Sequence, residues 1–144
     1  MKPRLVIDTN VLVTALCNQN GASHLLIRWI LAERVTLLAS PALWLEYEAV
    51  IKRSQLRLKH GISLENLDIV LDTLAAHVEP VHLNYLWRPQ LRDPNDEMVL
   101  ETALNGTADA LVTFNTKDFV AATGRFVMRL VTPSECIGLI GDIV

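Results

Sequence analysis

The sequence predicts an α/β fold, a single-domain α/β/α sandwich whose central sheet is mainly parallel. Short apolar runs of strand length alternate along the chain with longer segments whose apolar residues recur at helical spacing. The 144 residues are 51% hydrophobic, which is enough to build a core and to bury a sheet on both faces. No repeat, low-complexity segment or interdomain linker divides the chain, so we expect one domain over residues 1–144.

The first third of the chain predicts two strands, each followed by a helix. Residues 4–8 form a short β-branched run, and residues 18–21 read as a loop. Ser23 can cap a helix that runs to about residue 32, and residues 35–39 are a second buried strand. Ser40 and Pro41 then begin a helix that reaches about residue 53, since proline suits the first helical position.

The rest of the chain continues the alternation. A long helix is expected over 63–77, because Leu67, Val70, Leu71 and Leu74 make one apolar stripe. A helix over 96–105 should end at Gly106 in a left-handed conformation. The remaining expected elements are strands over 78–83, 110–113 and 126–131, a loop over 87–95, a short helix over 118–122 and a closing helix that begins at Thr132 and Pro133.

Composition predicts where in the cell the protein lies and excludes one class of protein. No apolar stretch approaches the roughly 18 residues that span a bilayer, and the first strand begins too early for a signal segment, so we expect a cytoplasmic protein without a membrane contact. The net charge of −3 argues against a non-specific nucleic-acid coat protein but not against a nuclease, whose own carboxylates lower the charge. A basic group could attract phosphate or could simply be a solvated helix end; its members are Lys52, Arg53, Arg57, Lys59 and His60.

Acidic residues stand where expected strands end or expected helices begin. Asp8 follows the first strand, and Asp118 follows a later one. Glu46 lies one turn into a helix, and Asp93, Asp96 and Glu97 surround the start of another. Sites in parallel α/β sheets form outside the carboxyl ends of the strands. Carboxylates gathered there repel each other unless a cation lies between them, and oxygen ligands suit Mg²⁺ or Mn²⁺.

Five segments resemble, in order and with suitable spacing, the motifs of PIN-domain ribonucleases. They are Leu-Val-Ile-Asp-Thr-Asn-Val-Leu-Val at 5–13, Ser-Pro-Ala-Leu-Trp-Leu-Glu at 40–46, Arg-Asp-Pro-Asn-Asp-Glu at 92–97, Ala-Asp-Ala-Leu-Val-Thr-Phe-Asn-Thr-Lys-Asp-Phe at 108–119 and Arg-Leu-Val-Thr-Pro-Ser-Glu at 129–135. The chain looks most like the toxins of prokaryotic toxin–antitoxin pairs. The resemblance implies a PIN-like fold, a Mg²⁺- or Mn²⁺-dependent endoribonuclease, an RNA substrate and a cognate antitoxin.

Carried over position by position, the resemblance implies an acidic quartet of catalytic metal ligands: Asp8, Glu46, Asp96 and Asp118. Supporting residues would be Asn10, Asp93, Glu97, Thr113 and Asn115, of which Asn10, Thr113 and Asn115 would orient ligands or water. Many relatives carry aspartate where Asn115 stands, so either Asp118 or Asn115 could lie closer to the metal. Glu97 remains an alternative to Asp96 as the third ligand, and the site could hold one ion or two.

Other functions fit the same sequence less well. A haloacid-dehalogenase-type phosphatase also has aspartate after its first strand, but it needs a second aspartate where Asn10 stands. A non-catalytic nucleic-acid or protein binding module on a PIN-like fold is the main alternative, and the four intact carboxylates weigh against it. A nuclease that acts on DNA could use the same metal chemistry, so specificity for RNA rests on the resemblance alone.

Bulky apolar residues around the second and third expected helices predict a homodimer. They are more numerous than a small core needs, although core packing would also account for them: Trp29, Leu43, Trp44, Tyr47 and Trp87. Proteins of the resembling family pair with themselves and with an antitoxin segment. We therefore expect part of the region 23–53 at a subunit interface.

Overall fold

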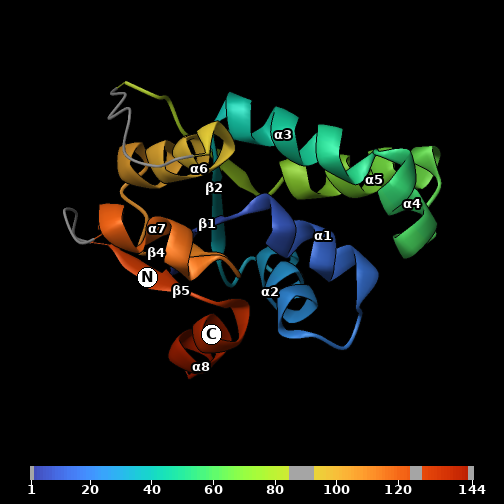
Figure 1. The fold of residues 1–144 in the computed structure, drawn as a ribbon. Helices are drawn as coiled ribbons and strands as arrows, with labels where there is room; N and C mark the ends of the chain where they lie inside the picture. Colours follow the sequence, from blue (N-terminus) through green and yellow to red (C-terminus); the bar gives the residue numbers. More distant parts are fainter. Residues whose placement is uncertain (1, 85–92, 124–127, 143–144) are drawn as a thin grey trace.

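The computed structural model describes residues 2–84, 93–123 and 128–142, and a parallel sheet runs through them. Five strands lie in the order β3-β2-β1-β4-β5, and every neighbouring pair is parallel (Figure 1). The strands are β1 (Arg4–Ile7), β2 (Thr36–Ala39), β3 (Val78–Pro80), β4 (Ala110–Val112) and β5 (Arg129–Val131). The expected α/β fold with a mainly parallel sheet is confirmed.

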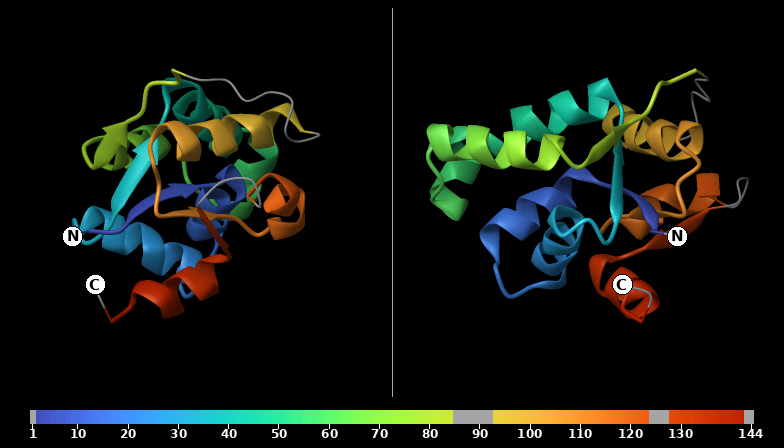
Figure 2. Two further views of the ribbon diagram at one scale, coloured as in Figure 1. Left: turned by 90° about the vertical axis from the view of Figure 1, so that its left-hand side faces the viewer. Right: turned by 180° about the vertical axis from the view of Figure 1, so that it is seen from behind.

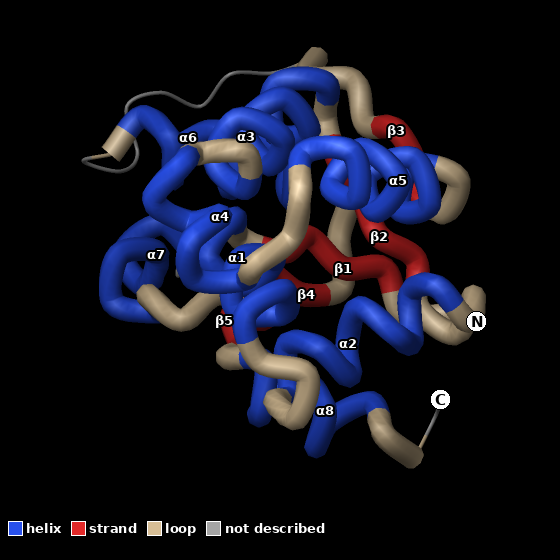
Figure 3. The backbone as a smooth tube through the Cα atoms, turned by 90° about the vertical axis from the view of Figure 1, so that its right-hand side faces the viewer, coloured by secondary structure: helices blue, strands red, loops and turns tan. Residues whose placement is uncertain are grey.

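Helices cover both faces of this sheet. The described helices are α1 (Thr9–Cys17), α2 (Ala22–Leu31), α3 (Pro41–Ile51), α4 (Ser54–His60), α5 (Leu64–Ala75), α6 (Pro94–Asn105), α7 (Thr116–Thr123) and α8 (Pro133–Ile140). Helix α6 packs against β1, β2 and β4 on one face, while α2 and α8 pack together on the other (Figures 1 and 3). None of the helices that the structure describes is long and apolar enough to span a bilayer.

Burial on both faces explains the apolar strands. Val6 and Ile7 of β1 are fully buried and lie opposite Leu111 and Val112 of β4. Side chains of successive strand residues point to opposite faces, so a strand covered on both sides needs apolar residues at consecutive positions. The runs that predicted strands in the sequence are therefore the runs that fill the core between the helices.

The order of the strands creates a switch point beside β1. From β1 the chain continues to β2 and β3 on one side of the sheet, and later to β4 and β5 on the other side. In open α/β sheets, ligands bind outside the carboxyl ends of the strands beside such a switch point, which here are the ends of β1 and β4. At the opposite edge of the sheet, the start of β1 and the end of α8 lie side by side (Figure 2).

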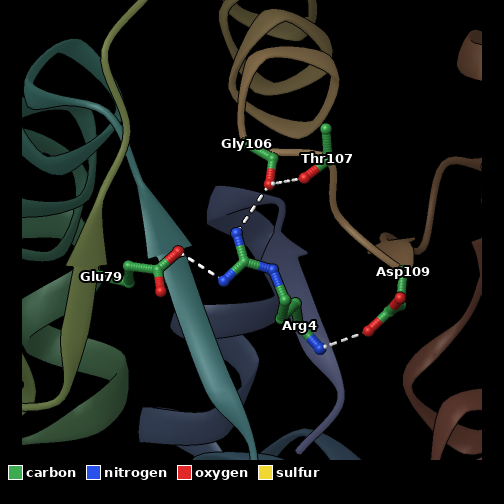
Figure 4. Close-up of polar contacts among 5 residues, drawn as sticks. All are labelled: Arg4, Glu79, Gly106, Thr107 and Asp109. Carbon is green, nitrogen blue, oxygen red and sulfur yellow. Dashed lines mark hydrogen bonds and ion pairs between the residues drawn. The ribbon is translucent and has the colours of Figure 1, made fainter. Parts of the chain in front are cut away.

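That opposite edge is held by Arg4. Its Nη1 lies 2.6 Å from Glu79 Oε2, its Nη2 donates to the Gly106 carbonyl at 2.8 Å, and its backbone N–H donates to Asp109 Oδ2 at 2.8 Å (Figure 4). One residue at the start of β1 thus connects β3 with the turn between α6 and β4. It fixes the edge of the sheet that lies away from the switch point.

The expectation that Gly106 closes α6 in a left-handed conformation is wrong. Its φ is −85° and its backbone is right-handed. Glycine is required there for space, because a Cβ would lie 2.9 Å from Val81 Cγ2 and 3.1 Å from Leu38 Cδ1. Among the residues that the structure describes, the glycine with a left-handed backbone is Gly61, with φ of 69°, at the end of α4.

Several element boundaries differ from those expected. Helices α1 and α4 were not expected. Helix α4 carries three members of the basic group, Arg57, Lys59 and His60, in its last turn, where the helix dipole favours cations. Asp96 does not open α6, because Asp93 is its N-cap and Pro94 its first residue. Strand β3 ends at Pro80 rather than at residue 83. The expected loop over 87–95 and strand over 126–131 lie partly outside the described residues.

The bulky residues that predicted a dimer belong mainly to the core. Leu43 and Tyr47 are completely buried, and Trp29 and Trp44 pack partly buried against the core. Trp87 lies outside the described residues. Core packing therefore accounts for most of this group, and the homodimer stays a prediction.

Candidate acidic site

Asp8 lies at the centre of the candidate site, directly after β1. Its backbone N–H donates to the carbonyl of Val112 at 2.8 Å, which extends the pairing of β1 with β4 by one residue. Its side chain caps α1, since Oδ1 accepts the N–H of Thr9 at 2.8 Å. The other oxygen, Oδ2, accepts the hydroxyl of Thr113 at 2.7 Å. Both carboxylate oxygens are thus oriented by residues at the switch point.

Thr113 ties the end of β4 to Asp8. Its backbone N–H donates to Val131 at 2.9 Å, and its Oγ1 also accepts the N–H of Asn115 at 3.0 Å. Its side chain is completely buried. Thr113 is therefore placed as a donor to a proposed ligand, the arrangement expected for a supporting residue; its role toward a metal stays a prediction.

Burial and nearby charges oppose the ionisation of Asp8. The pKa of this carboxyl is raised, chiefly because burial removes water from the charged form. The hydrogen bonds from Thr113 and Thr9 lower the pKa, and the charges of Asp118 and Asp93 raise it. The hydrogen-bond donors therefore offset only part of the desolvation, and the net effect is a raised pKa for Asp8.

Asp96, in the first turn of α6, belongs to the same electrostatic group. Its pKa is raised from 3.8 to about 6, first by desolvation and then by the charges of Asp8, Asp93 and Asp118. Asp93 caps the helix through the N–H of Asn95, and Asp118 lies in the first turn of α7. The N-termini of α6 and α7 thus bring carboxylates within electrostatic range of the end of β1.

Glu46 lies in the second turn of α3, and its neighbour Tyr47 connects this helix to β1. The Tyr47 hydroxyl donates to the Ile7 carbonyl at 2.5 Å, and its pKa is raised well above its usual value by burial and by the charge of Asp8. Glu46 itself is half-buried and makes no hydrogen bond or ion pair with any described residue. Helix α3 therefore approaches the site, while the carboxylate of Glu46 is not joined to the others.

The remaining predicted site residues differ in their surroundings. Glu97 is 4% exposed and points into the interior, unlike Asp96 on the same turn, which is partly exposed. Asn115 is exposed, and Asn10 is partly buried in the first turn of α1. No described hydrogen bond joins Asn10 Oδ1, a buried acceptor, to a partner.

The donor set suits a hard divalent cation. The pKa values of Asp8 and Asp96 are raised first by desolvation and then by repulsion between the carboxylates, and a bound cation would offset both effects. Among the described residues, however, no three histidine, cysteine, aspartate or glutamate side chains stand in a preformed metal-binding group. The carboxylates would therefore have to draw together to hold an ion.

Two supports of the site were not predicted from the sequence. The first is Tyr47, whose only signal was its spacing of four residues from Leu43 on the apolar side of α3. The second is a buried hydrogen bond of 2.8 Å between the hydroxyls of Ser40 and Thr102, which joins the start of α3 to α6. Polar pairs between elements have no local sequence pattern, so only the fold reveals them.

Comparison with known families decides the relationship of the chain. The family described as PIN domain matches residues 4–117, a span that contains Asp8, Glu46 and Asp96 and ends one residue before Asp118. The chain belongs to the PIN-domain family. No curated protein matches the sequence.

Two solved structures share the PIN fold seen here. One is VapBC2 from Rickettsia felis bound to a DNA fragment from their promoter, with a TM-score of 0.57 and 20% identity over 90% of this chain and 98% of that one. The other is FitAB bound to the IR36 DNA fragment, with a TM-score of 0.56 and 18% identity over 90% of this chain and 94% of that one. At these identities the likeness supports the PIN-like fold alone.

Proposed function

We propose that this PIN-domain protein is a Mg²⁺- or Mn²⁺-dependent endoribonuclease and the toxin of a toxin–antitoxin pair. The observation that carries the proposal is the electrostatic coupling of Asp8, Asp93, Asp96 and Asp118 at the switch point of the sheet. Carboxyl groups whose pKa values are raised by burial and by neighbouring carboxylates, as for Asp8 and Asp96, are typical of functional sites. Carboxylate oxygens bind hard cations such as Mg²⁺ and Mn²⁺. Membership of the PIN-domain family supports a nuclease function.

Each proposed residue has a definite task. Asp8 and Asp96 would hold the cation, with Glu46 and Asp118 completing the ligand set. A bound divalent cation supplies Lewis acidity, which lowers the pKa of water and offsets negative charge on the phosphate. Thr113 keeps Asp8 oriented, and the buried Tyr47 holds α3 against the end of β1. Asp93 would act as a supporting carboxylate that also caps α6.

The test is a cleavage assay on total RNA and on single-stranded DNA, with Mg²⁺, with Mn²⁺ and with a chelator. The parent protein should cut RNA only when a cation is present. Asp8→Asn should lower the rate by 100-fold or more, in keeping with loss of a ligand or electrostatic group of about 3 kcal/mol. The matched control is Asp72→Asn on α5, an exposed aspartate far along the chain from the carboxylate group.

Three outcomes would count against the proposal. Cleavage that persists in chelator would remove the cation from the mechanism. Preference for DNA would change the substrate while keeping the chemistry. A parent protein that cuts neither polymer but binds one of them would favour the alternative, a non-catalytic binding module on the PIN fold.

The partner that we propose is an antitoxin protein. Support comes from the resemblance of the motifs to toxins of such pairs and from a fold similar to that in the VapBC2 and FitAB assemblies. Co-expression with the product of an adjacent gene that encodes a small DNA-binding protein should yield a complex that survives gel filtration and suppresses cleavage. If that product neither binds nor inhibits, the toxin role is wrong and the nuclease role is unaffected.

A further inference from the structure

Phe114 is unusual among the aromatic residues of this protein. Its side chain is 44% exposed, whereas Phe119, five positions later, is completely buried. Among the described residues it is the one aromatic side chain on the exposed surface. Single exposed apolar residues need no special explanation in general, so the position of Phe114 has to carry the argument.

That position is the middle of a turn attached to Asp8. Thr113 Oγ1 donates to Asp8 Oδ2 at 2.7 Å and accepts the N–H of Asn115 at 3.0 Å, which closes a short loop around Phe114. The backbone of Thr113 is paired with β5 through Val131. The backbone that carries the ring is therefore fixed relative to Asp8, and an aromatic side chain with only two rotatable bonds loses little entropy when it binds a ligand.

A cation stands on the same segment. Lys117, in the first turn of α7, is exposed and makes no ion pair within the described part of the chain. Lys52, at the end of α3, is by contrast paired with Asp68 and Glu48. An aromatic ring and an unpaired ammonium group beside a phosphate-cutting site are the two components with which proteins bind single-stranded nucleic acid.

We propose that Phe114 is a stacking platform for one unpaired base next to the phosphate that is cut, and that Lys117 contacts a neighbouring phosphate. The inference rests on the proposed nuclease function and assigns to Phe114 a contact with a base of its substrate. A base inside a duplex is stacked on its neighbours and offers no free face, whereas an unpaired base of any identity has one.

The experiment measures binding separately from cleavage. The probe is a short single-stranded RNA that carries 2-aminopurine, whose fluorescence is quenched when it stacks, in the presence of Ca²⁺, with a gel to verify that the RNA stays intact. The parent should bind this RNA and quench it, and should bind the same sequence in a duplex at least tenfold more weakly. Phe114→Leu should weaken binding by roughly 5- to 100-fold and remove the quenching, while Phe114→Trp should keep both.

Two further variants separate stacking from general effects. Ile69→Ala removes an apolar side chain that is 62% exposed on α5, and it should leave binding and quenching unchanged. Lys117→Gln should weaken binding without changing the quenching, and should reduce the slope of log affinity against log salt by about one unit of charge. In cleavage assays Phe114→Leu should raise KM with little change in kcat, since stacking acts on bound substrate and transition state alike.

The platform is rejected if Phe114→Leu binds and quenches like the parent, or if the parent binds duplex as tightly as single strand. Phe114 would then be free to contact a protein partner instead. Failure of the nuclease function gives a different result: a parent that binds and quenches single-stranded RNA through Phe114, but cleaves no RNA with Mg²⁺ or Mn²⁺, keeps the platform and loses the activity.

Discussion

The side chain of Asp8 has a structural role and a proposed catalytic role. It caps α1 through Thr9 and joins β1 to β4 through Thr113, yet it is only 7% exposed and lies within range of other carboxylates. Burial of a charge is costly, and a cation would offset that cost. Sites of this kind are stabilised in the metal-free protein when the charge is removed.

Asp8→Asn should therefore stabilise the metal-free protein and abolish most of its response to metal. Asparagine fills the same space and can still accept the N–H of Thr9. In chelator at pH 7, we expect the free energy of unfolding from urea titrations to rise by about 1 kcal/mol. Mn²⁺ at about 100 times its dissociation constant should raise the free energy of unfolding of the parent by about 2.7 kcal/mol, and that of the variant by much less. A variant that is less stable than the parent in chelator would show that Asp8 is chiefly a structural cap.

The raised pKa of Asp96 predicts how the stability of the metal-free protein depends on pH. Its pKa of about 6 lies above the ordinary 3.8, so the folded state holds this proton more tightly than the unfolded state does. The contribution of Asp96 to the free energy of unfolding is therefore largest below about pH 4. It decreases as pH rises from about 4 to about 6, and it stays constant at higher pH. Competition between proton and metal should make Mn²⁺ bind more weakly as pH falls below about 6.

The measurement for Asp96 compares urea unfolding of the parent and Asp96→Asn in chelator between pH 4.5 and 7. Asparagine cannot ionise, so the variant should gain stability relative to the parent as pH rises through this window. Subtracting the two curves removes the contributions of groups that do not interact with Asp96, whereas Asp8, whose charge raises the pKa of Asp96, remains part of the difference. An equal difference at both ends of the range would mean that Asp96 titrates as an ordinary surface carboxyl.

At the scale of single residues, the sequence predicted where the aspartates lie on the strands and helices better than it predicted their surroundings, and their role as metal ligands stays a prediction. Asp8, Asp96 and Asp118 could be placed because each lies directly after a strand or in the first turn of a helix. The partners of Asp8 were harder to place, since Thr113 is distant in the sequence and meets Asp8 only because β1 and β4 are neighbours. Whether Glu46 joins the ligand set stays a prediction, because a side chain in the second turn of a helix can turn in several directions.

At the scale of elements, Gly106 was correctly predicted to end α6, but the predicted reason for a glycine at this position was wrong. Glycine after a helix usually indicates a left-handed residue. Gly106 is instead right-handed, and its missing Cβ makes room for Val81 and Leu38. The requirement comes from packing between α6, β2 and the segment after β3, which has no signature in the local sequence.

Gly106→Ala should consequently destabilise the protein, although alanine normally favours helical backbone. The added methyl would lie 2.9 Å from Val81 Cγ2, so side chains in a packed core must shift. We expect a loss of about 1–3 kcal/mol in the free energy of unfolding, measured by urea titration. The double variant Gly106→Ala with Val81→Ala should recover part of this loss. Should alanine at 106 stabilise the protein, the turn after α6 is looser than the packing indicates.

Helix α4 was missed for a related reason. Its seven residues are too few to show a helical stripe, and its charged last turn resembles a solvated loop. His60 secures its end, since Nε2 lies 3.1 Å from the Ile51 carbonyl and Nδ1 accepts the N–H of Ile62. These contacts make the basic group of α4 part of a defined helix end, as one of the two sequence-based interpretations expected.

At the scale of the whole molecule, alternation of strands and helices was enough to predict a parallel sheet but not its order. The position of β1 between β2 and β4 depends on which way each crossover packs, and helices must cover both faces. That order is what places Asp8 beside Thr113. The motifs resembling PIN domains therefore carried the information about the site that periodicity alone lacked.

The predicted homodimer can now be tested on a specific surface. Within the region 23–53, Leu43 and Tyr47 are buried in the core, but Leu45 on the same helix is 65% exposed. Light scattering at micromolar concentration should give twice the 16.1 kDa mass of one chain, because a stable dimer of this kind buries about 1,200 Å² or more. Leu45→Glu should shift the mass to that of a monomer, since it places a charge in an apolar contact without disturbing the core.

The control for the dimer is Leu58→Glu on α4, where the side chain is 88% exposed and lies outside the predicted region. It should leave the mass unchanged. A parent that is monomeric rejects the dimer, whereas a dimer that Leu45→Glu leaves intact moves the interface away from this part of α3. Neither result alters the proposed metal site, because Asp8, Glu46, Asp96 and Asp118 all come from one chain; a monomer that still cleaves RNA would separate assembly from catalysis.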